Sequence, residues 1–543
     1  MAGGVTDVLV VGAGPTGLTL AAQLQTFGTP FRIIDRQPDR AHESRALAIQ
    51  PRTLEVLDGL GLADAMVERG NPTVKLRLHA GRRAAEVPLF DTGLGETAFP
   101  FLLFLSQATT ESLLNRHLSE RSVEVERAVE LTGLDQHSDH VRCTVVHGDG
   151  HIEHLEARYV VGCDGPHSTV RTLAGIEFAG ASYPQTFVLA DLDVDGLRAG
   201  DAHVFLADAG MLFFFPLRAP APWRMLGWPL HPVSPAAATP TPADLQAIVD
   251  AYTGEGVRLH DPVWSTYFRL QHRHAVDYRS GRVFVAGDAA HVHSPAGAQG
   301  MNTGIQDAWN LGWKLALACA GTADPALLDS YQAERRPVGR SVLRFTDRAF
   351  TIATSTRPLH RFIRTRVAPR LGDLVTRVPA LRAAGFRAVS ELSVAYRRSI
   401  VVADDRRRPR RRPRAGDRLP DAPLHLEGRP TTLQRVCAGP VFHLLLAGEP
   451  TDWSGDALDD LARRCAGLVV VHRIARQPQP GALHDIEGVA LRRLALGRSD
   501  RPGLILVRPD GHLAYRADGV DISGLLQHLT TYRSPTSPAA DAS

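Results

Sequence analysis

The amino-terminal segment constrains the fold most strongly, because a glycine-rich turn stands between an apolar strand and an amphipathic helix. Gly12, Gly14 and Gly17 follow the run VTDVLVV, and Asp35 ends the next apolar run. Such glycines let the backbone turn tightly and approach a pyrophosphate at the helix N-terminus, and the acidic side chain accepts hydrogen bonds from ribose hydroxyls. The pattern predicts a βαβ unit that binds a dinucleotide. The predicted contacts are Gly12, Gly14, Pro15, Thr16, Gly17, Asp35 and Arg36.

The composition excludes several other classes of protein. A chain of 543 residues, 44% of them hydrophobic, is long enough for more than one buried core. Its 61 basic and 58 acidic side chains nearly balance, so neither nucleic acid nor an anionic membrane surface is expected as a partner. No run reaches the length of a membrane span, and the 5 cysteines have neither metal-ligand nor redox spacing. We therefore expect a cytoplasmic protein without a metal.

The order of patterns along the chain indicates several domains. A helix is expected to begin near Thr109, and alternating runs between Val129 and Val161 predict a β-meander. Apolar-polar alternation then predicts a mainly antiparallel sheet, and an arginine- and proline-rich stretch further on is typical of a solvated linker. The predicted divisions are 1–180 for the first part of the dinucleotide-binding domain, with 71–100 contributing to the sheet domain, 181–275 for the sheet domain, 276–400 for the second part and a helical region, 401–423 for the linker, 424–533 for a small α/β domain and 534–543 for a disordered tail.

Two later motifs show which dinucleotide is expected. The run GDAAHVHSPAGAQGMNTGIQDAWNLGWKLA begins at Gly287, and VVGCDGPHSTVR contains Asp164 and Gly165. Together with the glycine-rich turn, these motifs make the chain resemble the aromatic-hydroxylase flavoproteins, the single-component FAD monooxygenases typified by para-hydroxybenzoate and phenol hydroxylases. The resemblance covers about residues 6 to 400. It implies FAD as the cofactor and NAD(P)H as the electron donor.

The resemblance also implies a role for each residue of the later glycine-rich run. The turn of Gly287 and Asp288 would place its carboxylate on the ribityl chain of the flavin, and Pro295 would border the flavin face where oxygen reacts. The backbone of Gly300, Met301 and Asn302 would surround the pyrimidine ring. A helix that begins near Asn302 suits this role, because reduced flavin is an anion and a helix N-terminus stabilises negative charge.

Four further residues match family positions. Arg45 matches the arginine that reaches the FAD pyrophosphate, since a guanidinium fork suits phosphate oxygens. Gln107 matches a glutamine near the pyrophosphate and the ribityl chain, and the pair Asp164 and Gly165 matches a motif between the flavin and the nicotinamide site. The nearby His291 and His293 invite a metal hypothesis, but no third ligand has suitable spacing.

The carboxyl-terminal segment resembles the thioredoxin-like domain of phenol hydroxylases and of hydroxylases that tailor aromatic polyketides. It lacks the C-x-x-C that redox chemistry would require. The complete resemblance implies an α/β fold: a Rossmann-like FAD-binding domain with an inserted, mainly antiparallel substrate-binding sheet, a helical segment and a thioredoxin-like C-terminal α/β domain. A monomer or a homodimer is expected.

The reaction implied by the resemblance is the hydroxylation of a phenolic or polycyclic, polyketide-type secondary metabolite with NAD(P)H and O₂ through a flavin hydroperoxide. Two alternatives stay open: a Baeyer–Villiger or ring-rearranging oxygenation on the same scaffold, and a non-redox cyclase or binding protein that holds FAD. A product with an inserted ester oxygen would indicate the first, and a flavin that is never reduced would indicate the second.

An oxygenation site must exclude water, so an apolar cavity wall is expected near the flavin. The segment from His203 to Trp228 is the candidate wall, although Phe213, Phe215 and Trp228 are equally compatible with an ordinary sheet core. A base that deprotonates a phenol would increase the reactivity of the ring. His203, Tyr183 and Tyr267 are all candidates, and the sequence does not rank them.

Overall fold

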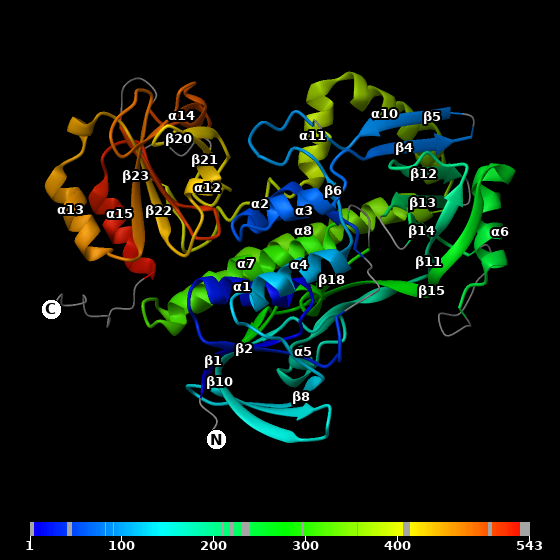
Figure 1. Cartoon of the computed structure of the whole chain (residues 1–543), viewed down its shortest axis with the longest axis horizontal. Coiled ribbons are helices and arrows are strands. Elements are labelled where there is room, and N and C mark those ends of the chain that lie inside the picture. Colours follow the sequence, from blue (N-terminus) through cyan, green and yellow to red (C-terminus); the bar gives the residue numbers. More distant parts are fainter. Residues whose placement is uncertain are drawn as a thin grey trace.

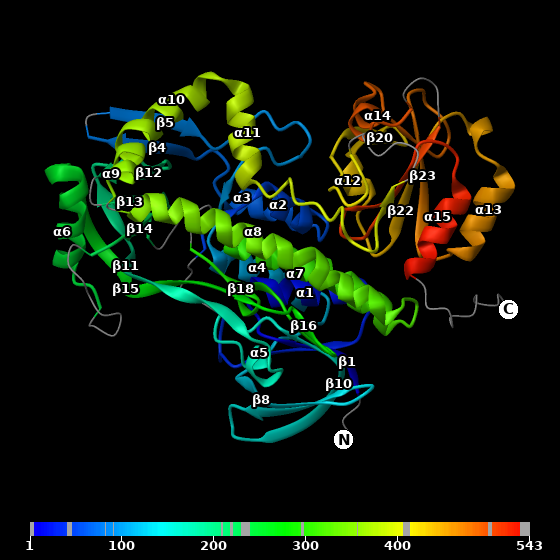
Figure 2. The same cartoon turned by 180° about the vertical axis from the view of Figure 1, so that it is seen from behind.

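Three large sheets and the helices packed on them make up the molecule. The computed structural model describes residues 5–40, 46–81, 83–90, 92–207, 210–217, 221–229, 239–294, 298–355, 357–404, 413–497 and 502–532. Figures 1 and 2 show the carboxyl-terminal sheet at one end of the molecule and the predicted substrate-binding sheet at the other. The long helices α7 (Gly300–Cys319) and α8 (Asp329–Thr354) lie between them.

The first sheet contains the amino-terminal strand at its centre. β1 pairs in parallel with β2 on one side and with β10 on the other, and β17 continues the parallel order beyond β10. Val8, Leu9 and Val10 of β1 are all fully buried, because both faces of this sheet are covered. The strands are β1 (Thr6–Val11), β2 (Phe31–Asp35), β7 (Glu126–Arg127), β8 (Val129–Gln136), β9 (Val141–His147), β10 (Ile152–Gly162), β16 (Arg279–Ser280) and β17 (Val283–Val285).

Different layers cover the two faces of this sheet. α1 and α7 pack against the face that Val8 and Val10 present, and the predicted β-meander β8–β9–β10 packs with Leu9 and Val11 on the other face. The remaining elements of this part are α1 (Pro15–Thr26), β3 (Ala48–Ile49), α2 (Pro51–Asp58), α3 (Ala63–Arg69), β6 (Leu103–Phe104), α4 (Gln107–Ser119) and α5 (Thr169–Leu173).

Two predicted helix beginnings were displaced. α4 begins at Gln107 rather than near Thr109, because the Ser106 hydroxyl accepts a hydrogen bond from the Thr109 amide at 3.1 Å and caps the helix one residue before Gln107. α7 begins at Gly300 rather than near Asn302, so the predicted flavin loop supplies the first turn of this helix.

The second sheet is mainly antiparallel, in the order β18-β15-β11-β14-β13-β12-β4-β5. β4 and β5 come from residues 75–88, and β4 joins the sheet by pairing in parallel with β12. One face is covered by α6, the other in part by α8. The elements are β4 (Lys75–Ala80), β5 (Arg83–Pro88), β11 (Phe178–Asp195), β12 (Ala202–Ala207), β13 (Gly210–Pro216), β14 (Trp223–Gly227), α6 (Pro242–Thr253), η1 (Gly254–Gly256), β15 (Arg258–Ala275) and β18 (His291–Val292).

A helical region links the part built on the first sheet to the last domain. The sequence predicts helices over residues 326–400, and the helices end at Val389, after which residues 390–400 form turns. No helix of the described residues is long and apolar enough to cross a membrane. The remaining elements are η2 (Gly287–Ala289), η3 (Pro325–Leu328), α9 (Pro358–Phe362), η4 (Ile363–Val367), α10 (Ala368–Arg377) and α11 (Pro379–Val389).

The carboxyl-terminal domain is a mixed α/β unit. The strand order β23-β22-β25-β26, with the first pair parallel and the others antiparallel, is a thioredoxin-like arrangement. β19, within the segment predicted as a linker, pairs with β26 at the sheet edge, whereas residues 405–412 lie outside the described residues. The elements are β19 (Ala403–Asp404), β20 (Pro423–Leu426), β21 (Arg429–Thr432), α12 (Leu433–Val436), β22 (Phe442–Ala447), η5 (Pro450–Asp452), α13 (Gly455–Arg464), β23 (Val469–Ala475), β24 (Ala482–His484), α14 (Val489–Leu494), β25 (Gly503–Val507), β26 (Leu513–Ala517), α15 (Ile522–Leu529) and η7 (Thr530–Tyr532).

Candidate dinucleotide site

The glycine-rich turn after β1 is tightly packed at two glycines and open at the third. A Cβ on Gly12 would lie 2.4 Å from the Cys163 carbonyl oxygen, and one on Gly17 would lie 1.9 Å from the Gly12 oxygen. No atom lies within 4 Å of a Cβ on Gly14, which is the N-cap of α1 and supplies no capping side chain. The N-terminus of α1 therefore has no side-chain cap and lies beside open space at Gly14, as an anion-binding helix end requires.

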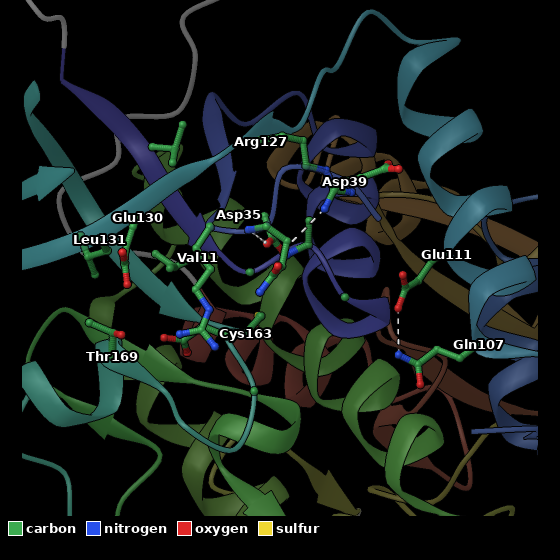
Figure 3. A pocket seen from close by; sticks show the side chains of 18 residues that line it. Val11, Asp35, Asp39, Gln107, Glu111, Arg127, Glu130, Leu131, Cys163 and Thr169 are labelled. Atoms are coloured by element: carbon green, nitrogen blue, oxygen red, sulfur yellow. Dashed lines mark hydrogen bonds and ion pairs between the residues drawn. The ribbon is translucent and has the colours of Figure 1, made fainter. Parts of the chain in front are cut away.

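A pocket of about 270 Å³ lies beside this turn, where β1, β2 and β10 end. Ligands of open α/β sheets bind at the carboxyl ends of the parallel strands, so the location suits a dinucleotide. In Figure 3, Gln107 and Glu111 lie on one side of the pocket and Glu130 and Leu131 on the other. The predicted site residues in its lining are Gly12, Gly14, Asp35, Arg36, Gln107, Asp164 and Gly165.

The Asp35 carboxylate is fixed by the backbone on both of its oxygens. Oδ2 accepts a hydrogen bond from the Ala13 amide at 2.6 Å, and Oδ1 accepts one from the Gln37 amide at 2.8 Å. The predicted ribose contact is thus preorganised at the end of β2. Arg127 approaches within 3.8 Å of the same carboxylate, and sequence reasoning missed it. Arg127 lies on β7, which pairs in parallel with the end of β2, and this pairing is the feature that would have indicated it.

Asp164 has a free acceptor beside the pocket. Its Oδ2 accepts a hydrogen bond from the Val170 amide at 3.1 Å, whereas Oδ1 is buried with no hydrogen-bond partner among the described residues. Burial raises the pKa of this carboxyl, against the hydrogen bonds that favour its charged form. Gly165 follows with a φ of +80°, which brings the chain back toward α5. A buried acceptor without a partner is expected where a ligand hydroxyl or amide binds.

The predicted flavin-contacting turn at Gly287 packs against the glycine-rich turn after β1 through Thr16. A Cβ on Gly287 would lie 2.4 Å from the Thr16 hydroxyl, and the φ of Gly287 is +61°. Asp288 is exposed although its neighbours Gly287 and Ala289 are buried, so its side chain points out of the turn. The carboxylate therefore lies at the surface of the turn.

The first turn of α7 is held by the side chain of Asn302. Its Oδ1 accepts a hydrogen bond from the Gln50 amide at 2.8 Å, and its Nδ2 donates to the Ala48 and Ala298 oxygens at 2.9 and 2.7 Å. These bonds engage the Asn302 side chain within the protein, and the role of the Met301 and Asn302 backbone toward a cofactor stays a prediction. The N-cap Gln299 makes no capping bond, so α7 also presents an uncapped N-terminus.

A buried carboxylate fixes the turn of Gly287 against α7. Asp307 accepts hydrogen bonds from the Gly287 amide at 3.1 Å, from His291 Nε2 at 2.7 Å and from Arg335 Nε at 2.7 Å. Burial opposes its charge, yet Arg335 and His291 hold the pKa of Asp307 below its ordinary value. His291 is thereby a partner of Asp307, and no group of metal ligands occurs among the described residues.

One face of the second sheet is aromatic and turns toward the flavin-binding part. On β13, Phe214 packs with α6, whereas Phe213 and Phe215 point the other way and stack at 5.8 Å between ring centroids. The Phe215 ring lies 6.3 Å from that of Phe104 on β6, which pairs with Ala48 next to the Asn302 side chain. Phe104 and Ala48 thus connect the aromatic face to the side chain of Asn302 at the α7 N-terminus.

The three candidate bases lie on different faces of this sheet. His203 contacts Trp223 on the α6 face, its ring nitrogens lie 3.0 Å from His79 and 3.1 Å from the Arg198 oxygen, and burial lowers its pKa. Tyr267 packs with the α6 cluster as well. Tyr183 alone lies on the aromatic face, where its hydroxyl donates to Asp347 at 2.8 Å, and burial together with this carboxylate raises its pKa.

These features fit an extended FAD molecule. The uncapped N-termini of α1 and α7 suit its two negatively charged parts, and the carboxylates of Asp35, Asp164 and Asp288 are among the predicted contacts. The predicted residues Arg45 and Pro295 lie outside the described residues, so their roles stay predictions.

Comparison with known proteins shows the family to which the chain belongs. A family model described as an FAD binding domain matches residues 5–346, and one described as the C-terminal part of aromatic-ring hydroxylases matches residues 412–534. The chain therefore belongs to the FAD-dependent aromatic-ring hydroxylases and is a flavin-dependent aromatic monooxygenase. FAD is its cofactor, and the class of enzyme implies NAD(P)H as the electron donor.

Several relatives are named for the compounds on which they act. A 6-methylpretetramide 4-monooxygenase of Streptomyces rimosus is 40% identical over 368 residues, which are 67% of this chain and 63% of that protein. An anhydrotetracycline monooxygenase of the same species is 34% identical over 549 residues, 97% of this chain and 99% of that protein. The crystal structure of aklavinone-11 hydroxylase with FAD and aklavinone has a TM-score of 0.80 and 25% identity, and covers 98% of this chain and 99% of that one.

Proposed function

We propose that this enzyme hydroxylates a polycyclic, polyketide-type aromatic compound with NAD(P)H and O₂. The observation that carries the proposal is the aromatic face of the second sheet, which approaches the α7 N-terminus through Phe215 and Phe104. A flat apolar ring system suits such a wall, because aromatic side chains stack on aromatic ligands. The names of the relatives support the same substrate class.

Each part of the site has a role in this proposal. Bound and reduced FAD supplies the activation of dioxygen that amino-acid side chains cannot provide. The open space at Gly14 accommodates the pyrophosphate, and Asp35 binds the ribose. Asp288 binds the ribityl chain, and the α7 amides at Met301 and Asn302 stabilise negative charge on the pyrimidine ring.

The aromatic wall keeps water away from the reacting atoms. Phe213 and Phe215 are half-buried, and Trp228 lies 5.4 Å from Phe187 between ring centroids on the same face. Tyr183 is on this face, but its hydroxyl already donates to Asp347 at 2.8 Å, and burial and this carboxylate raise its pKa further above neutral pH. We therefore assign it the positioning of substrate and assign no catalytic base.

The test is an anaerobic reduction assay. Purified holoenzyme is mixed with NADH or NADPH and with a series of phenols and polycyclic aromatic compounds, and the loss of oxidised flavin absorbance is followed. We expect polycyclic phenols to accelerate reduction and, after oxygen is admitted, to gain a ring hydroxyl. A product with an inserted ester oxygen would replace this function by Baeyer–Villiger chemistry. A flavin that no ligand and neither nicotinamide reduces would replace it by a non-redox role.

A further inference from the structure

The turn between β25 and β26 of the carboxyl-terminal domain is buried, although such turns normally lie at the surface. Arg508, Asp510 and His512 are exposed by only 0%, 1% and 3%. The turn spans Arg508–His512, and Figures 1 and 2 show the carboxyl-terminal sheet beside α2 and α7 of the flavin-binding part. What buries the turn is therefore the other domain.

Arg508 enters a buried cluster of charges on α7 and α8. Its guanidinium donates to both oxygens of Glu334, at 2.6 and 2.9 Å. Glu334 also accepts hydrogen bonds from Lys314 Nζ at 2.8 Å and from Asn310 Nδ2 at 2.7 Å. Arg508 pairs with Asp510 as well, so two cations face two carboxylates. Removing one member would leave an uncompensated buried charge.

From the same turn, one route leads through α2 to the flavin loop. Arg52 donates to the Asp510 carbonyl oxygen at 2.7 Å. Gln50, which precedes α2 directly, donates its amide to Asn302 Oδ1 at 2.8 Å. The N-terminal end of α2 is thus fixed between the carboxyl-terminal turn and the first turn of α7.

A second route leads through Arg335 to the Gly287 turn. The His512 ring lies 4.3 Å from the Tyr396 ring, and the Tyr396 hydroxyl accepts a hydrogen bond from Arg335 at 2.9 Å. Arg335 in turn pairs with Asp307, whose carboxylate holds the Gly287 amide. The first turn of α7 and the Gly287 turn are therefore both connected, through side-chain contacts, to the turn Arg508–His512 of the last domain.

We propose that the turn Arg508–His512 positions the FAD site, so that the carboxyl-terminal domain is part of the cofactor-binding machinery. The inference rests on the proposed placement of the flavin at Asp288 and Asn302. Arg508 and Asp510 act through other side chains and are positioning residues. The domain needs no cysteine pair for this role, which agrees with its lack of a C-x-x-C.

The experiment compares two arginines of the same domain. Arg516 is also buried, but it donates to the Pro413, Leu494 and Ala495 oxygens, all within residues 413–517. Arg508→Lys and Arg516→Lys are converted to apoprotein and titrated with FAD by fluorescence, and thermal unfolding of each apoprotein is recorded. We expect Arg508→Lys to raise the Kd for FAD at least tenfold and to shift the flavin absorption bands. Arg516→Lys should stay within twofold of the wild-type Kd, even though its melting temperature falls. Equal Kd values for the two variants would overturn the proposal.

A second variant tests the same proposal from the flavin-binding side. Arg52→Met removes the bond to Asp510 and also the ion pair with Glu55 at 3.0 Å, whereas Arg418 still pairs with Glu55 at 2.8 Å. It changes no residue of the carboxyl-terminal domain. We expect a weaker Kd for FAD, with partial recovery in Arg52→Lys, which retains a donor. An unchanged Kd in Arg52→Met would also overturn the proposal. The outcome is independent of the substrate, because FAD titration needs no turnover; a holoenzyme that binds FAD but oxidises no aromatic compound would refute only the proposed function.

Discussion

Replacing Gly14 with alanine should separate FAD binding from folding. Gly14 has φ −76° and ψ −176°, which alanine adopts without strain, and its Cβ would meet no atom within 4 Å. The loss of chain entropy in the unfolded state favours alanine by about 0.4–1 kcal/mol. Alanine is a poorer N-cap than glycine, which offsets this gain. We expect the free energy of unfolding of the apoprotein to change by less than about 1 kcal/mol.

The same methyl group would occupy the space assigned to the pyrophosphate. A hydrogen bond to a charged group contributes about 1.5–3 kcal/mol, and every 1.4 kcal/mol is a tenfold change in affinity. If the methyl group displaces the pyrophosphate from one amide of α1, the Kd for FAD should rise about 10- to 100-fold. Fluorescence titration of apoprotein with FAD measures this change.

Gly17→Ala is the matched control. Its Cβ would lie 1.9 Å from the Gly12 carbonyl oxygen, so α1 or the turn must shift by more than an ångström. Overpacking of this kind costs about 1–3 kcal/mol or more, and chemical denaturation of the apoprotein should show it. The reasoning is refuted if Gly14→Ala binds FAD as tightly as the wild-type protein, or if it destabilises the apoprotein as much as Gly17→Ala does.

Four other substitutions test three separate parts of the structure. Asp288→Ala should purify folded but with little yellow FAD, and full flavin occupancy would contradict the ribityl assignment. Phe214→Ala should lower the free energy of unfolding by about 3–5 kcal/mol because it empties the α6 core, whereas Phe213→Ala should mainly raise the KM for a polycyclic substrate; equal stability losses in both variants would show that the two faces are misassigned. Burial raises the pKa of Glu391 from 4.5 to about 7, so its carboxyl stabilises the fold below pH 4.5 and loses this contribution as the pH rises to 7. The stability of Glu391→Gln relative to wild type should therefore increase by up to about 3 kcal/mol between pH 5 and pH 8, and a constant difference in thermal melts would contradict it.

The fold class predicted from the sequence is confirmed. It could be predicted because the sequence patterns that indicate it are local. The spacing of Gly12 and Gly17 has one steric solution, in which a Cβ at either position collides with backbone. The position of Asp35 at the end of β2 could be predicted from the length of the second apolar run. In contrast, Arg127 approaches Asp35 only because a two-residue strand pairs with β2, and no local pattern predicts such long-range pairing.

The sequence could not decide which face of a strand meets the cofactor. Alternation assigns Phe213 and Phe214 to opposite faces without saying which face α6 covers. The same ambiguity left His203 and Tyr267 beside Tyr183 as candidate bases, and both lie on the α6 face. The assigned roles of Gly287, Asp288 and Asn302 stay predictions that the experiments above test.

The cluster of Lys314, Glu334 and Arg508 has a consequence for biosynthesis. Glu334 and Arg508 are separated by 174 residues, which a ribosome adds in roughly 9–35 s at about 5–20 residues per second. Throughout this interval Glu334 on α8 lacks the two hydrogen bonds from Arg508 and keeps only those from Lys314 and Asn310 on α7. We expect FAD to bind only after the finished polypeptide is released. The carboxyl-terminal sheet is translated last, and its turn Arg508–His512 is needed to position the FAD site beside the first sheet.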